Sequence, residues 1–338
     1  MNTKPQGAPY RAAYDLGDGI QVTVFTDHAP LLQYLDEFHD RVGIAVLGGW
    51  TIVARLTDPT PGMTINPWGA GYQADAENRV LQRQVADPIF LRAGTQIAMR
   101  EALVEDWENR RYTMLHAAAV RKDNLLILFM GNMRAGKTTL ALNGATQHGF
   151  EIVSNDHTVV YRDGDHLVVT EIPTVIAVRI ATYLEIEDFL PQPYDSNGVD
   201  IEAWRNRPKK EQIEADDEHV MYYSRASLNQ PRRSSVRCGP GTDTQVVIVS
   251  PTFSSPAGAP QRVTDAEPLL RPHIRTKWAF DPNRNTQELP RTQRAPEVFL
   301  ADGLELAATL ASGAEAYTWQ HNGDITPLLE ALTAGRTV

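Results

Sequence analysis

The chain has 338 residues, of which 42% are hydrophobic and 22% charged, and it carries a formal net charge of −10. This composition is typical of a globular protein with one large or two ordinary domains, and the acidic balance argues against general binding to nucleic acid or to an anionic membrane. The single cysteine, Cys238, excludes an intrachain disulfide and suits a reducing compartment. The sequence shows no basic-then-apolar leader and no apolar run near the ~20 residues of a membrane span. We therefore expect a cytoplasmic protein.

Residues 1–111 are expected to form a small α+β domain without a catalytic motif or an internal repeat. The first 18 residues are rich in Pro, Gly and polar side chains, which favours a loose segment. Apolar residues at helical spacing predict helices over 29–39, with Asp27 as the N-cap, and over 95–111. The other predicted elements of this domain are strands at 20–25, 50–56, 80–85 and 89–91 and a Pro- and Gly-rich loop over 59–72.

Residues 112–338 are expected to form a second, α/β domain. Residues 124–130 are a continuous apolar run, as in a strand buried on both faces, and residues 138–148 have the apolar spacing of a helix that ends at Gly149. An Asp-Gly pair within 162–165 predicts a hairpin. The other predicted elements are strands at 114–120, 151–156, 157–161, 166–170, 174–180, 244–250 and 316–320 and helices at 299–312 and 325–334.

Residues 191–241 stand apart within this second domain, because Pro, Asn, Gln and charged residues dominate them. A segment of this length without periodicity is usually functional or disordered. We expect it to contain the least ordered part of the domain and to contribute to acceptor binding. His219 lies within it, directly after the acidic run 216–218, and no second His or Cys stands at metal-ligand spacing from it. A solvated acidic run is therefore favoured over a metal site.

The stretch between the 124–130 strand and the following helix fits the phosphate-binding pattern G-x-x-x-x-G-K-[ST]. Its glycines allow the backbone to wrap around phosphate oxygens, and the helix N-terminus adds the positive end of its dipole. Lys137 has the reach to contact the β- and γ-phosphates, and the Thr138 hydroxyl can bind Mg²⁺. The sequence therefore predicts ATP and Mg²⁺ as ligands. The residues expected to contact the nucleotide are Gly131, Asn132, Met133, Arg134, Ala135, Gly136, Lys137, Thr138 and Thr139.

Three stretches together resemble the catalytic domain of the HPr kinase/phosphorylase family and its HPr-kinase-like relatives: Leu115-His116, the loop 131–138, and residues 153–156, which read Val-Ser-Asn-Asp. That family has a histidine at the end of the strand before the P-loop strand and an acidic pair one helix and one strand later. The resemblance covers about residues 112–180. It implies a P-loop core with a mixed sheet like that of HPr kinase and PEP carboxykinase, preceded here by the small α+β domain.

The same resemblance implies roles for single residues. His116, Lys137 and Asp156 would be catalytic, and Thr138 and Asp156 would bind the metal ion. A structural histidine and a strand-end turn residue remain the alternatives for His116 and Asp156. Arginines that could clamp a phosphate between two N–H groups are Arg225, Arg232, Arg233, Arg237, Arg271 and Arg275.

Two departures from the family's pattern affect the expected substrate. First, Asn155-Asp156 stands in place of the family's two aspartates, and the helix before this pair is one residue longer. Second, the sequence has no clear match to the family's glutamate signature. Glu171 is the candidate for that glutamate, and the alternative is that Glu171 is a solvated strand residue. HPr itself is therefore not carried over as the substrate. Because an amide does not take a proton at neutral pH, Asp156 rather than Asn155 is expected to be the catalytic carboxylate.

The function expected from these features is transfer of the γ-phosphate of ATP to a hydroxyl, on a peptide or protein serine or threonine or on a small molecule. Two alternatives stay open: a carboxykinase-like reaction on a carboxylate metabolite, and a non-enzymatic nucleotide-binding regulatory protein, which Asn155 in place of an acid would suit. The identity of the acceptor, the choice among ATP, GTP and pyrophosphate as donor, and the formation of a homo-oligomer are left open as well.

Overall fold

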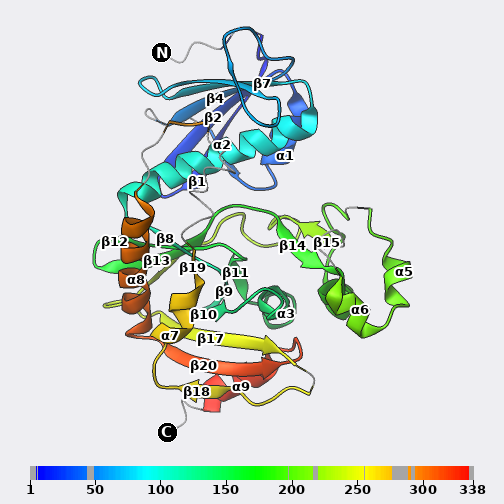
Figure 1. Cartoon of the computed structure of the whole chain (residues 1–338), viewed down its shortest axis with the longest axis vertical. Helices are drawn as coiled ribbons and strands as arrows, with labels where there is room; N and C mark the ends of the chain where they lie inside the picture. Colours follow the sequence, from blue (N-terminus) through cyan, green and yellow to red (C-terminus); the bar gives the residue numbers. More distant parts are fainter. Residues whose placement is uncertain are drawn as a thin grey trace. The chain divides into compact units, whose positions relative to one another are not determined.

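The computed structural model describes residue 5 and residues 7–43, 49–196, 198–215, 220–254, 256–275, 288–290 and 294–334. It shows a mixed α/β protein with several mixed and antiparallel sheets (Figure 1). The chain divides into two compact units. The first is Met1–Arg110 with Lys277–Ala295, and the second is Arg111–Thr276 with Pro296–Val338. The sequence analysis placed residues 277–295 in the second domain, whereas the structure assigns this segment to the first unit.

The first unit is built on a seven-stranded sheet with the order β3-β1-β2-β4-β7-β6-β5. Its centre is parallel, because β2 pairs with β4 and β4 with β7 in the same direction, and antiparallel pairs flank this centre. Helices α1 and α2 pack against each other and against the sheet. The elements are β1 Tyr10–Gly17, β2 Ile20–Thr26, α1 Ala29–Leu35, β3 Asp40–Val42, β4 Trp50–Leu56, β5 Thr64–Ile65, β6 Gly71–Asp75, β7 Val80–Val85 and α2 Pro88–Asn109.

Several sequence predictions for this unit are wrong. The segment expected to be loose contains β1, which pairs with β2 across a tight turn in which Asp18 and Gly19 both have positive φ. Residues 89–91 do not form a strand but lie in the first turn of α2, where the Asp87 carboxylate accepts the Ile89 N–H at 2.7 Å. The predicted loop over 59–72 contains β5 and the start of β6. Asp27 does not cap α1; its carboxylate accepts the backbone N–H of Leu56 at 2.9 Å.

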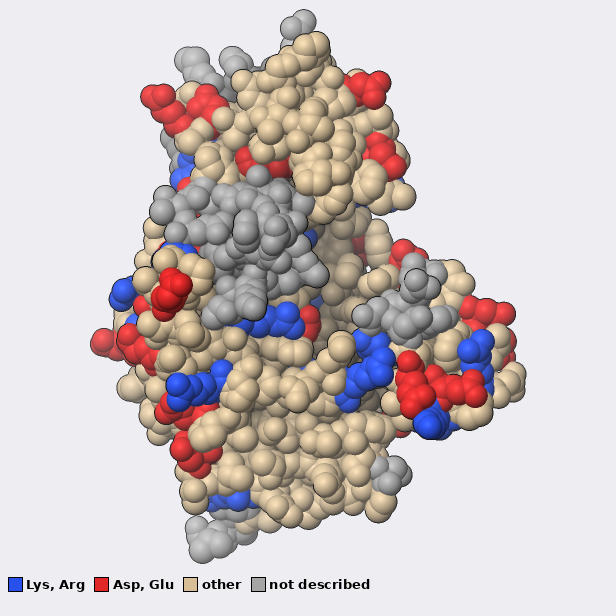
Figure 2. All heavy atoms as spheres, viewed as in Figure 1, with Lys and Arg blue, Asp and Glu red and all other residues tan. Residues whose placement is uncertain are grey.

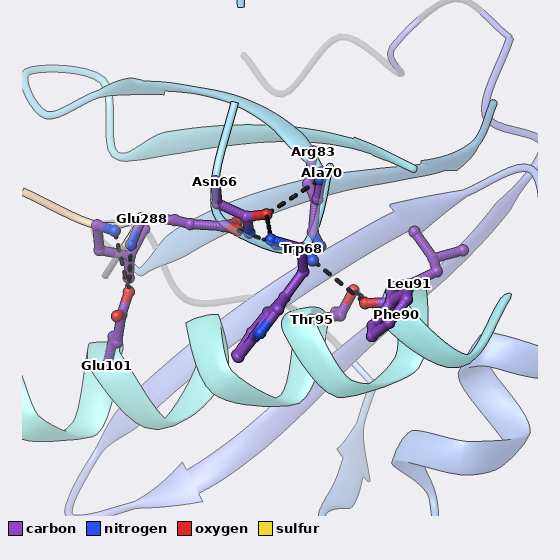
Figure 3. Close-up of polar contacts among 10 residues, drawn as sticks. Asn66, Trp68, Ala70, Arg83, Phe90, Leu91, Thr95, Glu101 and Glu288 are labelled. Atoms are coloured by element: carbon purple, nitrogen blue, oxygen red, sulfur yellow. Dashed lines mark hydrogen bonds and ion pairs between the residues drawn. The ribbon is translucent and has the colours of Figure 1, made fainter. Parts of the chain in front are cut away.

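A buried polar network attaches the later segment of the chain to the first unit (Figure 3). Arg83, fully shielded from solvent, forms an ion pair with Glu288, and the Asn66 side-chain amide donates to the same carboxylate at 2.9 Å. Glu101 of α2 accepts the backbone N–H groups of Glu288 and of the next residue, both at 3.0 Å. Position 94 is glycine because a Cβ there would overlap the Arg83 guanidinium. The acceptors on α2 thus fix the path of residues 288–289.

The second unit contains three sheets, with the orders β11-β9-β10-β17-β20-β18, β16-β13-β12-β8-β19 and β14-β15. In the six-stranded sheet, β10 is antiparallel to β9 and parallel to β17, which is itself parallel to β20. The strands are β8 Thr113–Leu115, β9 Ala117–Lys122, β10 Leu125–Met130, β11 Glu151–Ser154, β12 Thr158–Asp163, β13 His166–Glu171, β14 Ile176–Arg179, β15 Val220–Tyr223, β16 Val236–Cys238, β17 Gln245–Phe253, β18 Gln261–Val263, β19 Ile274–Arg275 and β20 Glu315–His321.

The residues of β10 are apolar without a break because the strand is covered on both sides. Leu126 and Leu128 belong to a core shared with the five-stranded sheet, α7 and α8, whereas Ile127 and Phe129 pack against α3 and α9. The helices of this unit are α3 Lys137–His148, α4 Ile180–Ile186, α5 Ile201–Arg205, α6 Lys209–Glu214, α7 Glu267–Leu270, α8 Pro296–Ala311 and α9 Thr326–Ala334, with short 3₁₀ turns η1 Glu187–Phe189 and η2 Arg271–His273.

Most strands and helices predicted for this unit are present in the structure. The buried strand before the glycine-rich loop, the helix after it and the hairpin between β12 and β13 are confirmed. The segment 191–241 is more regular than predicted, since α5, α6, β15 and β16 lie within it. His219 and the acidic residues before it lie outside the described residues. Within the described part of the chain, no helix is long and apolar enough to cross a bilayer.

Candidate functional site

Residues 131–136 connect β10 to α3, and their last turn depends on a glycine. Gly136 is the N-cap of α3 with φ of 86°, and a Cβ there would overlap the imidazole of His321 at the end of β20. The Gly323 N–H donates to His321 Nδ1 at 3.0 Å, so Nε2 carries the proton and donates to the Ala135 carbonyl at 2.8 Å. Burial lowers the pKa of His321, which favours this neutral form. His321 thus supports the loop from behind, a role with no signal in the sequence.

Lys137 is folded back into the loop. Its Nζ donates to the carbonyls of Gly131 and Asn132, at 2.8 and 3.1 Å, and lies 3.1 Å from His116 Nε2. Only 8% of the residue is exposed. Burial lowers the pKa of Lys137 to about 8, although the nearby Asp156 carboxylate opposes the shift. The ammonium is therefore held at the mouth of the loop by weak acceptors that an anionic ligand could replace.

Asp156 is the centre of a cluster of cationic and imidazole groups. It follows the end of β11 with φ of 67°, in the left-handed region. Its Oδ1 lies 3.1 Å from His116 Nε2 and 3.4 Å from Arg275 Nη2, and its Oδ2 lies 3.2 Å from His157 Nδ1. Burial alone would raise the pKa of Asp156, but the hydrogen bond from His116 and the charges of His157 and Arg275 outweigh it and hold the pKa well below its usual range. The carboxylate is therefore ionised at neutral pH.

His116 stands between the lysine and the carboxylate. Its Nε2 is 3.1 Å from both Lys137 Nζ and Asp156 Oδ1. One ring nitrogen either donates or accepts, so Nε2 accepts from the ammonium or donates to the carboxylate, but not both at once. The position of one proton therefore decides which of the two groups His116 binds.

Asn155 and Asp156 both line the cavity, although neighbouring residues within a strand face opposite sides. The reason is that β11 ends at Ser154, so the two residues no longer alternate. Asn155 Oδ1 accepts a hydrogen bond from the Thr138 hydroxyl at 3.0 Å. The amide oxygen thus contacts the hydroxyl that the sequence analysis assigned to the metal.

Glu171 and Arg225 form a buried ion pair behind this corner instead of lining the cavity. The Glu171 carboxylate accepts the backbone N–H of Asn155, and Arg225 Nη2 donates to the Val153 carbonyl at 2.6 Å. Burial raises the pKa of Glu171, and Arg225 opposes this shift. Glu171 is therefore not the solvated residue favoured from the sequence. It holds the backbone on which the candidate catalytic residues stand.

Arg275 is the residue of the six proposed arginines that lines the cavity, among the residues that the structure describes. Strand β19 pairs with β8 so that Arg275 lies opposite Met114, and the backbone N–H of His116 donates to the His273 carbonyl at 2.8 Å. Because this pairing joins segments far apart in the sequence, the spacing of residues gave no reason to prefer Arg275 over the other five.

These residues surround a cavity of about 480 Å³ in the second unit. Residues 133–139 of the predicted nucleotide-binding set line it, as do His116 and Asp156, whereas Gly131 and Asn132 contribute through the carbonyls that hold Lys137. The structure thus brings the three predicted catalytic residues together. It adds His157, which the sequence analysis did not assign to the site, and it selects Arg275 from the six candidate arginines. The cavity also has a wall from α4, α6 and β14.

The cavity is richer in cations than the surface drawn in Figure 2. Among the described residues, five lysines or arginines line it, namely Arg134, Lys137, Arg179, Lys209 and Arg275, against two carboxylates, Asp156 and Glu185. On the face shown in Figure 2, acidic and basic side chains are intermingled over the coloured residues, including those around α5 and α6. In a chain with a net charge of −10, this local excess of positive charge is suited to an anionic ligand.

Oxygen atoms at one end of the cavity suit Mg²⁺. The Thr138 hydroxyl, the Asn155 amide oxygen and the Asp156 carboxylate lie in one corner, and Mg²⁺ is usually held by one or two carboxylates together with waters and substrate phosphates. In the described part of the chain, no group of three or more His, Cys, Asp or Glu residues is arranged to hold a metal ion by itself. The residues therefore fit an ion that arrives with a phosphate ligand better than a permanent metal centre.

No protein-family model matches the chain, and no curated protein sequence matches it. A functional interpretation has to rest on the residues and on their arrangement in the cavity.

Proposed function

We propose that this protein is an ATP- and Mg²⁺-dependent phosphotransferase of the HPr-kinase-like type. It transfers the γ-phosphate to a hydroxyl of a peptide or protein side chain or of a small molecule. The observation that carries this proposal is the meeting of the 131–139 loop with His116, Asp156 and Arg275 in one cavity. The P-loop assignment itself is part of the proposal, supported by the strand–loop–helix order and by the glycine at the helix N-cap.

Each residue would act on a different part of the reaction. The N-terminus of α3 and Lys137 would bind the phosphate chain, and Arg275 would face charge that develops on the transferred group. Thr138 and Asp156, with Asn155 beside them, would hold Mg²⁺, which supplies charge neutralisation between the phosphates. Asp156 would orient the acceptor hydroxyl and accept its proton, and His116 Nε2, 3.1 Å from Asp156 Oδ1, is placed to share that proton.

A second function, nucleotide binding without turnover, has two observations in its favour. Lys137 is held by the loop's own carbonyls and by His116, and Asn155 stands where the related kinases have an acid. Such a protein would use ATP to change the conformation of the cavity wall.

Incubation of the purified protein with γ-labelled ATP and lysate of the source organism separates the two functions. The kinase proposal predicts label in a new phosphorylated product and no label transfer with the Lys137→Ala variant. Tight ATP binding with no consumption in any acceptor-containing fraction would support the binding protein, and free phosphate as the sole product would contradict the kinase.

A further inference from the structure

The cavity continues past the residues that bind phosphate in the proposed function. Its far wall is formed by β14, α4 and α6, and the side chains that it contributes include Val175, Ala177, Ala181 and Ile213. An inorganic phosphate chain gains nothing from an apolar wall. A volume of about 480 Å³ lies in the range of sites that hold organic ligands with a few polar groups.

The contacts of α3 indicate which end of the cavity would hold the nucleoside of the donor. Lys137 would mark the position of the β- and γ-phosphates, and the cluster around Asp156 lies beside it. In-line transfer requires the acceptor to approach the γ-phosphate on the side opposite the leaving oxygen, so acceptor and remainder of the donor occupy opposite ends. Two residues along α3, the Thr139 hydroxyl lies 2.8 Å from the Thr182 hydroxyl of α4. The remainder of the donor would therefore extend along α4.

A carboxylate stands at this end of the cavity. Glu185 is one turn after Thr182 on the same helix, lines the cavity, and has 30% of its side chain exposed. Lys209 of α6 approaches its Oε1 at 3.7 Å, which is longer than a hydrogen bond and leaves acceptor positions on the carboxylate. Burial raises the pKa of Glu185, and Lys209 opposes that shift. A carboxylate is a usual acceptor for the hydroxyls of a ribose.

We propose that the wall of β14, α4 and α6 is the nucleoside subsite. Glu185 accepts hydrogen bonds from the ribose hydroxyls, and the base lies against Ala177, Ala181 and Ile213. This inference rests on the proposed function, because it starts from a phosphate chain on the 131–139 loop. It goes further by locating the nucleoside of that donor and naming the residues that bind its ribose and base. It also assigns Lys209 and Ile213, within the 191–241 segment, to the donor, whereas the sequence analysis expected that segment to bind the acceptor.

Calorimetric titration in the presence of Mg²⁺ tests the subsite with three probes, ATP, 2′-deoxy-ATP and tripolyphosphate. The wild-type protein should bind ATP at least about tenfold more tightly than tripolyphosphate. Glu185→Gln should weaken ATP binding about tenfold, because a charge-assisted hydrogen bond is lost. The same variant should leave tripolyphosphate binding within about twofold, and it should weaken 2′-deoxy-ATP less than ATP, because one of the hydroxyls is already missing.

Glu187→Gln is the matched control. Glu187 lies two residues further on, pairs with Arg205 at 2.8 Å and does not line the cavity, so its substitution should change none of the three affinities. Equal wild-type binding of ATP and tripolyphosphate, or an equal effect of Glu185→Gln on both, would overturn the subsite and leave the phosphate site standing. Absence of binding by both in the wild-type protein would overturn the proposed function together with the subsite.

Discussion

At the scale of single residues, the site is organised around the imidazole of His116. The two groups that it can bind, Lys137 and Asp156, are opposite in charge and equally distant from Nε2. A phosphate bound by Lys137 would withdraw the ammonium from the imidazole, and His116 would then be left to hydrogen-bond Asp156. The side chains are thus arranged so that binding of an anion changes the partner of the candidate base.

Substitution of the two residues after β11 separates their roles. Asp156→Asn keeps the shape of the side chain and removes its charge, so ATP binding should stay within a few-fold while the transfer rate falls about a hundredfold or more. Asn155→Ala should lower the rate less, because it removes a contact to the Thr138 hydroxyl and no proton acceptor. Steady-state kinetics of both variants checks this, and an inactive Asn155→Ala beside a fully active Asp156→Asn would reverse the assignment.

Lys137 should make the affinity for ATP depend on pH in the alkaline range. Its pKa is about 8 in the folded protein, against an ordinary value of 10.5, so the ammonium loses its proton as the pH rises through about 8. Phosphate binds the charged form, and ATP affinity should therefore decline above pH 8. Titration of ATP at pH 7 and pH 9 measures the effect, and Lys137→Ala, which binds more weakly, should show no such decline. A pH-independent affinity in the wild-type protein would contradict the role of Lys137.

At the scale of elements, the corner after β11 depends on a pair that does not line the cavity. Glu171 at the end of β13 and Arg225 after β15 are each about 3% exposed, and both bind the backbone of residues 153–155. Either single substitution, Glu171→Gln or Arg225→Met, leaves one uncompensated buried charge and should lower the free energy of unfolding by about 3–5 kcal/mol.

The double variant Glu171→Gln/Arg225→Met tests whether the two charges act as a pair. The double variant should lose clearly less free energy of unfolding than the two single variants lose in sum, because no buried charge is left without a partner. Denaturant unfolding of the four proteins provides the measurement. Additive losses would show that the two residues contribute independently.

The elements near the loop were predictable from the sequence because their signals are local. A continuous apolar run indicated β10, and helical spacing with a following glycine indicated α3. Strand 89–91 was a wrong prediction because three apolar residues suggested a strand, while Asp87 and Pro88 are the signals of a helix start. Arg275 and His321 reach the site through strand pairing, Arg275 opposite Met114 and His321 opposite Phe253. No local pattern encodes pairing between segments so far apart in the sequence.

At the scale of the whole molecule, the chain does not divide into two continuous halves. The described residues 288–290 and 294–295 belong to the first unit, where Glu101, Glu108 and Arg83 hold them. The domain boundary predicted at residue 111 did not assign this later segment to the first unit, because residues 281–296 have no hydrophobic periodicity and resemble a connecting segment. The anchoring groups are single polar side chains whose partners become visible only in the folded unit.

Loss of this anchor should affect the first unit alone. Arg83→Met leaves the buried Glu288 carboxylate without its cation and should destabilise the first unit by about 3–5 kcal/mol. The affinity for ATP should be unchanged, because the described residues that line the cavity all belong to the second unit. Thermal unfolding and ATP titration of the same preparation check both statements. A stability equal to that of the wild-type protein would show that the ion pair is not what holds residues 288–289.

The central claim is that the cavity transfers phosphate to a hydroxyl, and the chemical stability of the product tests it most directly. Label from γ-labelled ATP should enter a product that keeps its label in acid, as a phosphate ester does, and this product should form about a hundredfold more slowly with Asp156→Asn. A labelled product that hydroxylamine cleaves would be an acyl phosphate, which would place the transferred group on a carboxylate and contradict transfer to a hydroxyl. The absence of any labelled product, with ATP bound and unconsumed, would contradict the account.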